Sequence, residues 1–276
     1  MKVHYNIKIN HDVHPILADI FYPKLSNGCL VVFCHGFKGF KDWGAWHQVA
    51  EKFTKEGFVF LKFNFSHNGV GQEDLHAFTR LDLFYKNNYS RELQDLKLVS
   101  DWIEQDATIQ ALEIKNYYLI GHSRGGGIAI KTASMDKRWN KLITWASISD
   151  FDRFGDINEL SEWRKKGFRD YFNTRTQQNM RIGIQFYEDY KKHQAHLNIE
   201  SAAKSLDIPW LIIHGTLDNA VGFSHAKRLN KWNRDSELVL ISEADHVFGT
   251  KHPYSENQLP SHLLQVCEES ITFLNQ

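Results

Sequence analysis

Short apolar runs alternate with helical patterns along most of this 276-residue chain, and this alternation limits its possible folds most strongly. The apolar runs have the length of strands, and the segments between them repeat apolar residues at helical spacing. Strands that alternate with helices predict a mostly parallel sheet, doubly wound by helices on both faces. The strand patterns span residues 3–9, 15–23, 28–36, 58–65, 117–122, 142–149, 210–215 and 237–241. The helical patterns span residues 43–57, 90–105, 124–135, 224–232 and 261–275.

Three of these patterns allow more specific predictions. The first two strands turn at residues 10–14, which favours an antiparallel hairpin. Residues 28–36 are almost all apolar, as expected for a central strand that is covered on both faces. Ser90 is the expected N-cap of the helix over residues 90–105.

One interval of about 60 residues, Asp150 to Pro209, breaks the alternation. A crossover between parallel strands needs only about a dozen residues, and helix-like patterns occur at 157–172 and 177–193. We therefore expect a core formed by residues 1–150 and 206–276, with a helical cap or lid, residues 151–205, inserted after the sixth strand. Large aromatic side chains of this cap either form its own small core or line a substrate pocket. They are Trp163, Phe168, Tyr171, Phe172, Phe186, Tyr187 and Tyr190.

Charge and cysteine content exclude several classes of protein. The chain has 33 basic residues (lysine and arginine) and 33 acidic residues (aspartate and glutamate), without a long run of either sign. This balance argues against nucleic-acid or membrane-surface binding. Cys29 and Cys34 lie five positions apart on one strand and so point to opposite faces, which favours reduced thiols. No stretch resembles a signal peptide or approaches the roughly 18 apolar residues of a membrane span. We expect a cytoplasmic protein, monomeric or homodimeric.

The sequence Gly121-His122-Ser123-Arg124-Gly125 has the G-x-S-x-G form. It follows an apolar strand and precedes a helical pattern, which is where this motif presents a nucleophile on a strained turn. Glycines two positions either side of the serine leave room for a neighbouring chain to pass closely. Ser123 is therefore the predicted nucleophile.

A serine nucleophile needs a base, and the base needs a carboxylate that orients it. The chain has 15 histidines, so position must decide between them. Reactive groups of a doubly wound sheet gather at the carboxyl ends of its strands. Asp218 follows the strand at 210–215, and His246 follows the strand at 237–241. We predict Asp218 as the orienting acid and His246 as the base.

Alternatives to both residues exist. Asp150 also follows a strand and is a rival for the acid, whereas Asp245 is too close in sequence to reach the far ring nitrogen of its neighbour. His225 and His252 are the possible substitutes for the base.

Acyl transfer also requires donors for the developing oxyanion. The turn at Gly36 and Phe37 follows the central strand and can offer the Phe37 backbone N–H, and the N–H of Arg124 would be the second donor. His35 is expected to pack or to form hydrogen bonds beneath this loop.

Five motifs, CHGFKGF, FNFSHNGVG, GHSRGG, HGTLDNAV and EADHVF, together resemble the α/β-hydrolase superfamily. The likeness is greatest to its esterase-like branch of feruloyl (cinnamoyl) esterases, dienelactone hydrolase-like proteins and serine aminopeptidase-like lipases. It implies an eight-stranded sheet, a Ser123-His246-Asp218 triad and an oxyanion hole from the Phe37 and Arg124 amides. Feruloyl esterases are similar in carrying an insertion between the sixth and seventh strands. Arg124 replaces the glutamine or methionine of many relatives, and FNFSHNG replaces an Arg-Gly-His-Gly loop.

Other motifs do not support a cofactor or a metal. Gly125–Gly127 lack the lysine and hydroxyl residue that end a phosphate-binding loop. His11 and His14 have no thiolate or carboxylate set that would complete a zinc site. We expect a small-molecule substrate and no cofactor.

The sequence thus predicts a serine hydrolase that cleaves a carboxylic ester with a small or aromatic acyl group through an acyl-enzyme. A peptidase or amidase on the same triad is the alternative enzyme, and a peptide amine would need an acidic anchor. Candidates for that anchor are Glu159, Glu162, Glu188 and Asp189. A non-catalytic binding protein on a hydrolase scaffold is the alternative from another class.

Overall fold

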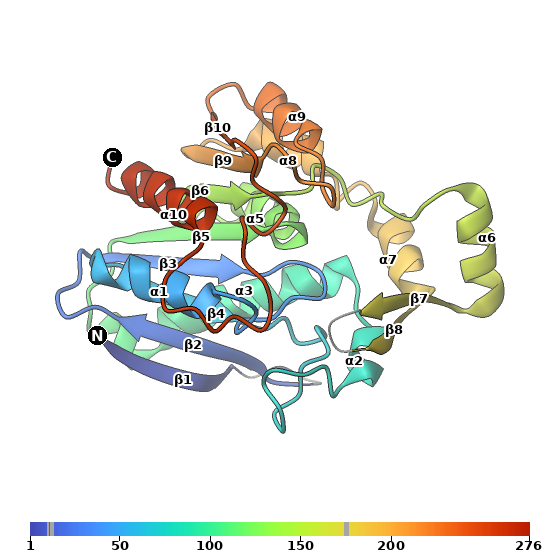
Figure 1. Cartoon of the computed structure of the whole chain (residues 1–276), viewed down its shortest axis with the longest axis horizontal. Coiled ribbons are helices and arrows are strands. Elements are labelled where there is room, and N and C mark those ends of the chain that lie inside the picture. The colour runs from blue at the N-terminus through green and yellow to red at the C-terminus, as the bar shows by residue number, and fades with distance from the viewer. Residues whose placement is uncertain (10, 12–13, 174–176) are drawn as a thin grey trace.

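A computed structural model describes residues 1–9, 11, 14–173 and 177–276 and shows one central sheet of eight strands (Figure 1). Their order is β1-β2-β4-β3-β5-β6-β9-β10. The strand β2 pairs antiparallel with both neighbours, and all other pairs are parallel. The predicted hairpin and mostly parallel sheet are confirmed. The bounds are β1 Lys2–Ile9, β2 Ile16–Tyr22, β3 Cys29–Cys34, β4 Val59–Phe63, β5 Asn116–His122, β6 Trp139–Trp145, β9 Trp210–Gly215 and β10 Glu237–Ile241.

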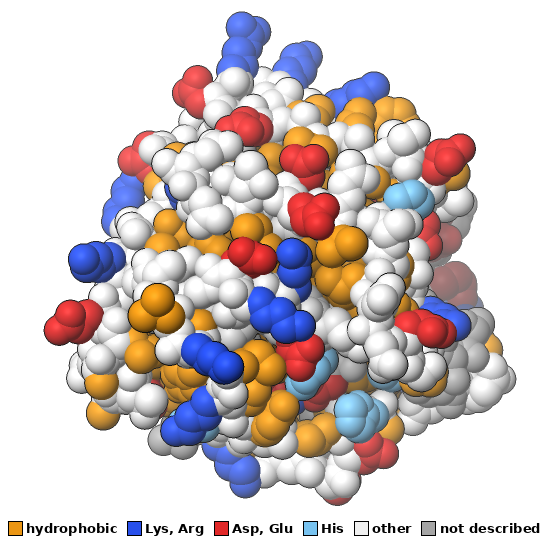
Figure 2. All heavy atoms as spheres, turned by 60° about the vertical axis from the view of Figure 1, so that its left-hand side comes forward, with side chains coloured by type: hydrophobic (Ala, Val, Ile, Leu, Met, Phe, Trp, Pro, Cys, Tyr) orange, Lys and Arg blue, Asp and Glu red, His pale blue; other side chains and the backbone are white. Residues whose placement is uncertain are grey.

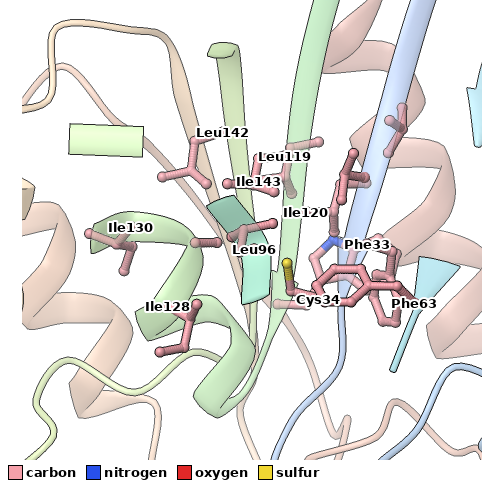
Figure 3. Packing of buried hydrophobic residues seen from close by; sticks show 14 of the residues in the cluster. Phe33, Cys34, Phe63, Leu96, Leu119, Ile120, Ile128, Ile130, Leu142 and Ile143 are labelled. Atoms are coloured by element: carbon pink, nitrogen blue, oxygen red, sulfur yellow. The ribbon is translucent and has the colours of Figure 1, made fainter. Parts of the chain in front are cut away.

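Helices cover both faces of this sheet, as the alternating pattern predicts. Helices α1 and α10 pack together on one face, and α3, α5, α8 and α9 form the other layer (Figure 1). Every residue of β3 and β4 is buried, which explains the unbroken apolar sequence of β3 and the sequence of β4, which is apolar except for Lys62. Figure 3 shows side chains of β3, β5 and β6 packed against Leu96 of α3 and Ile128 and Ile130 of α5. The bounds are α1 Trp46–Lys55, α2 Leu81–Tyr85, α3 Tyr89–Gln105, α4 Ala107–Gln110, α5 Arg124–Met135, α8 Ile199–Ser205, α9 Ser224–Trp232 and α10 Ser261–Leu274.

The surface carries both signs of charge. Figure 2 shows acidic and basic side chains interspersed with apolar ones on the face that it presents. Among the helices of the described residues, none combines the length and the apolar character that crossing a bilayer requires.

Two local predictions are wrong. The N-cap of α3 is Asn88, whose side chain accepts a hydrogen bond from the Arg91 N–H, whereas Ser90 lies inside the helix. The strand predicted at 142–149 is β6, Trp139–Trp145, so Asp150 lies five residues beyond its end. The predicted turn at residues 10–14 lies mostly outside the described residues.

The inserted segment, residues 151–205, differs from the predicted run of helices. It contains α6 (Ile157–Lys166), an antiparallel hairpin of β7 (Phe168–Asn173) and β8 (Gln178–Gly183), and α7 (Gln185–His193) before α8. The helical predictions for 168–172 and 178–183 are therefore wrong. Gly167 ends α6 in the left-handed conformation, and the aromatic residues that follow suit a strand. The hairpin and α7 lie beyond the carboxyl ends of the parallel strands (Figure 1).

A buried ion network ties the loop after β3 to strands β2 and β4. Asp19 of β2 accepts from Lys41 at 2.7 Å and from Lys62 of β4 at 3.1 Å. Asp42 pairs with both lysines, at 2.5 Å from Lys41. Asp19, Lys41 and Lys62 are fully buried, so each charge depends on its partners.

Asp19→Asn should therefore lower the free energy of unfolding by about 3 kcal/mol, because two buried ammonium groups would share one carboxylate. Urea denaturation measures this change. Lys137→Met is the control: it breaks the exposed pair with Asp207 and should change stability by less than about 0.5 kcal/mol. Equal effects of the two substitutions would contradict the role of the network.

Candidate active site

Ser123 occupies a strained turn between β5 and α5. Its backbone has φ 56° and ψ −121°, in the positive-φ region that side chains disfavour. The Ser123 N–H donates to the Trp145 carbonyl at 2.9 Å, and the Ser123 carbonyl accepts from Gly126 N–H at 3.0 Å. These bonds to β6 and α5 hold the turn so that the serine side chain points away from the sheet and into a cavity.

Gly125 and Gly36 allow this turn to touch the loop that follows β3, and Gly121 allows close packing within the turn. A Cβ atom on Gly125 would lie 2.4 Å from the His35 carbonyl oxygen, and one on Gly121 would lie 2.5 Å from the Gly125 carbonyl oxygen. A Cβ atom on Gly36 would approach the Ser123 Cβ to 2.9 Å. The Gly121 and Gly125 contacts are with backbone atoms and the Gly36 contact is with the Ser123 Cβ, so a side chain at any of these positions would force the segments apart.

The structure brings together the three residues that sequence reasoning predicts as a triad. His246 Nε2 lies 3.0 Å from Ser123 Oγ, and His246 Nδ1 lies 2.7 Å from Asp218 Oδ2. Asp218 and His246 come from the loops after β9 and β10, and the parallel sheet brings these loops to the same edge as the end of β5.

The alternative residues lie elsewhere. Asp150 lies 3.4 Å from the Arg228 guanidinium and 3.9 Å from His225 Nδ1. His225 contacts the Ser149 backbone, and His252 accepts from the Gly44 N–H.

Asp218 is held as an anion by an array of donors. Its Oδ1 accepts from the Ala220 and Val221 N–H groups at 2.9 and 2.8 Å, and its Oδ2 lies 3.1 Å from His214 Nε2. Burial alone would raise the pKa of this carboxyl, but the hydrogen bonds from His214 and His246 hold the pKa well below its usual range. Sequence reasoning missed His214, although a histidine inside the apolar strand β9 was a usable signal.

Phe37 and Arg124, whose backbone amides are the predicted oxyanion donors, line the same cavity as Ser123. Arg124 is the first residue of α5, so its N–H has no partner within the helix and lies at the positive end of the helix dipole. Phe37 follows Gly36, whose missing side chain lets this loop reach Ser123. Its ring stacks on Phe84 and meets Tyr171 edge-on.

His35 positions the Phe37 loop through both ring nitrogens. Nδ1 lies 2.8 Å from the Gly36 carbonyl oxygen and must donate, and Nε2 accepts from the Phe65 N–H at 3.3 Å. This pattern requires the neutral ring with hydrogen on Nδ1. Burial lowers the pKa of His35 to about 4, and the Arg124 cation adds to this shift. The expected role of His35 beneath the loop agrees with these contacts.

A cavity of about 520 Å³ opens above Ser123 and His246. Phe154, Tyr171, Ile182 and Phe186 of the inserted segment contribute to its wall. Other aromatic residues of that segment behave differently: Trp163 and Tyr190 are buried within it, and Phe172 is half exposed on the surface. The core contributes Phe37, Trp43, Trp46 and Tyr89 to the wall.

The Arg124 side chain is fixed by a residue that sequence reasoning missed. Its Nη2 donates to Glu92 Oε1 of α3 at 2.7 Å, and its guanidinium lies 4.3 Å from the centroid of the Phe37 ring. Glu92 is buried and also accepts from the Asn87 side chain at 2.8 Å. Arg124, which follows the predicted nucleophile, thus packs against the ring of Phe37, whose amide is the other predicted oxyanion donor.

Comparison with known proteins identifies the relatives of this chain. The family model described as "Serine aminopeptidase, S33" matches residues 27–182. The human (Homo sapiens) serine hydrolase BPHL is 28% identical over 191 residues, which cover 62% of this chain and 64% of that protein. The AB hydrolase superfamily protein YisY of Bacillus subtilis (strain 168) is 25% identical over 270 residues, covering 82% of this chain and 88% of that protein. This chain thus spans somewhat less than two thirds of the human relative.

Solved structures share the fold at lower identity. Est1E from Butyrivibrio proteoclasticus with bound ferulic acid has a TM-score of 0.76 and 19% identity, and the match covers 98% of each chain. The dienelactone hydrolase from Anabaena variabilis ATCC 29413 has a TM-score of 0.64 and 16% identity, with 99% of this chain and 97% of that chain covered. These likenesses confirm the predicted α/β-hydrolase fold.

Gly125→Ala should lower the free energy of unfolding by about 2 kcal/mol, because the new methyl group meets two backbone carbonyls of the neighbouring loop. Gly222→Ala is the matched control, since its nearest neighbour would be Ser224 Oγ at 3.7 Å, and it should stay within about 0.5 kcal/mol. Urea denaturation of both variants tests the pair. An unchanged Gly125→Ala protein would refute the close backbone contact.

His35 should make the protein less stable in acid. The unfolded chain binds a proton at an ordinary histidine pKa, about 6.5, whereas the folded ring does so only near its pKa of about 4. The unfolded state therefore binds more protons at pH 5, which costs about 2 kcal/mol relative to pH 7.5. Replacing the ring by His35→Gln should reduce the loss of stability between these two pH values by that amount. If the free energy of unfolding of both proteins fell equally between pH 7.5 and pH 5, the low pKa of His35 would be contradicted.

Proposed function

The chain belongs to the serine aminopeptidase S33 family and is an α/β hydrolase, and on this basis we propose that it cleaves carboxylic esters through an acyl-enzyme on Ser123. The observation that carries the proposal is the position of His246, within hydrogen-bonding distance of both Ser123 Oγ and the Asp218 carboxylate. Nucleophile, base and orienting acid are thereby aligned at the floor of a cavity.

The proposed reaction uses this geometry in two halves. Ser123 Oγ attacks the ester carbonyl carbon while its proton passes to His246 Nε2, and Asp218 stabilises the resulting imidazolium. The Phe37 and Arg124 N–H groups donate to the oxyanion. The bond to the alcohol oxygen then breaks, and that oxygen takes the proton from His246. Water repeats these steps on the acyl-enzyme and releases the acid.

The charge of the cavity wall supports an ester over a peptide with a free amino terminus. No aspartate or glutamate lines the cavity among the described residues. Glu159, Glu162 and Glu188 are exposed on the inserted segment. Asp189 accepts from Ser90 Oγ at 2.9 Å and lies 3.2 Å from His193 Nδ1. A peptide ammonium group would therefore lack an acidic anchor.

The lining also supports the proposed acyl group. Seven aromatic residues border the cavity, and their rings offer flat apolar surfaces to a short or aromatic acyl chain. Est1E, which shares the fold, has been solved with bound ferulic acid, an aromatic acid.

Ser123→Ala should reduce kcat/KM on p-nitrophenyl butyrate and methyl ferulate by at least about 10³-fold, because no group replaces the nucleophile. Asp218→Asn should lower kcat by about 10³-fold or more, since His246 loses the partner that fixes its tautomer. Unchanged urea denaturation midpoints for both variants would serve as the control for folding.

The same assay distinguishes the alternatives. Wild-type protein should hydrolyse the esters and leave alanine and leucine p-nitroanilides uncleaved. Faster cleavage of the anilides than of the esters would establish the peptidase instead. Equal ester rates for wild-type and Ser123→Ala protein would favour a non-catalytic binding protein.

A further inference from the structure

The wall of the cavity carries charge of one sign. Three of its lining residues are basic, Lys38, Arg124 and Arg153, and no lining residue among those described is acidic. The Asp218 carboxylate lies behind His246 and is fully used by its own donors. The lining of the cavity therefore offers a ligand basic side chains and no carboxylate.

Arg124 is already paired. Its guanidinium donates to the buried Glu92 carboxylate at 2.7 Å and lies over the ring of Phe37. The side chain is 11% exposed, so this cation is held inside the wall and is neutralised there. Arg124 is thus a structural cation rather than an anchor for a ligand.

Arg153 differs in its contacts. Its Nη2 donates to the Ala220 carbonyl at 3.1 Å, and its Nη1 lies 3.2 Å from His225 Nε2. Both contacts are to uncharged groups. Across the part of the chain that the structure describes, no carboxylate forms an ion pair with Arg153, whereas nearby Arg228 lies 3.4 Å from Asp150. Arg153 belongs to an exposed loop of the inserted segment, so its guanidinium is accessible from the cavity.

The contact with His225 does not give Arg153 Nη1 a hydrogen-bond acceptor. Burial, together with the Arg228 and Arg153 cations, lowers the pKa of His225 to about 4, so its ring is neutral at pH 7. A neutral imidazole has one acceptor nitrogen, and the Ser149 N–H already donates to Nδ1 at 3.0 Å. Nε2 therefore carries the ring hydrogen and points it toward Arg153 Nη1. The N–H groups of Arg153 Nη1 and His225 Nε2 therefore face each other, and a carboxylate oxygen could accept from both.

We propose that the cavity selects esters that carry a carboxylate group and that Arg153 binds this carboxylate. The inference rests on the proposed ester hydrolase function and names the substrate class of that site. The carboxylate can belong to the acyl part or to the alcohol part of the ester, since either arrangement places an anion beside the same guanidinium. The aromatic walls would hold the carbon skeleton between the anion and the scissile carbonyl.

Two matched substrate pairs test the proposal. In the first pair, mono-p-nitrophenyl adipate carries a carboxylate on its acyl part, and p-nitrophenyl hexanoate is its uncharged counterpart. In the second pair, 4-carboxyphenyl butyrate carries the carboxylate on its alcohol part, and 4-carbamoylphenyl butyrate is its uncharged counterpart. Wild-type protein should prefer the carboxylate ester in at least one pair by about tenfold in kcat/KM, mostly through KM, and 0.5 M NaCl should weaken the preference.

Variants assign this preference to one residue. Arg153→Gln should abolish it, and Arg153→Lys should restore part of it. Arg228→Gln is the matched control, because Arg228 also contacts His225 but does not line the cavity, and this variant should keep the preference.

Each outcome has a distinct meaning. Turnover of neutral and charged esters without preference in either pair would overturn this inference alone, as would a preference that survives Arg153→Gln. No turnover of any of the four esters would overturn the proposed ester hydrolase function together with the inference.

Discussion

The contact between the Ser123 turn and the loop after β3 is the constraint on which the rest of the site depends. Backbone atoms of Cys34 and His35 lie where a side chain on Gly125 would have to go, so this approach exists only because that side chain is absent. The contact places Ser123 between His246 on one side and the Phe37 loop on the other. The strained backbone of Ser123 is maintained by hydrogen bonds to Trp145 of β6, to Gly126 of α5 and to Ile148.

Polar groups that take no part in the proposed chemistry hold the Phe37 loop in place. His35 connects its first turn to the backbone after β4, and the buried lysines and aspartates connect its later residues to β2 and β4. Donors for an oxyanion are effective only when they are preorganised, because reorienting them during the reaction would cost part of the stabilisation. The stability of this loop and the proposed function of the site are therefore linked.

The two parts of the chain make different contributions to the cavity. Its floor, with Ser123, Asp218 and His246, comes from the turn and loops that follow β5, β9 and β10. The inserted segment supplies aromatic wall residues and Arg153. Differences between relatives in such a segment change the shape and charge of the wall without moving the groups on the floor.

The sequence by itself determined the order of strands and helices, the parallel sheet, and the loops that carry Ser123, Asp218 and His246. These features depend on local periodicity and on the rule that parallel strands end at one edge of a sheet. Only the tertiary structure decided the hairpin at Phe168–Gly183, the pairing of Arg124 with Glu92, and the contacts of Arg153 with His225. Partners in the last two contacts lie 32 and 72 positions apart, so no local pattern relates them. These contacts form only when the sheet brings distant helices and loops together.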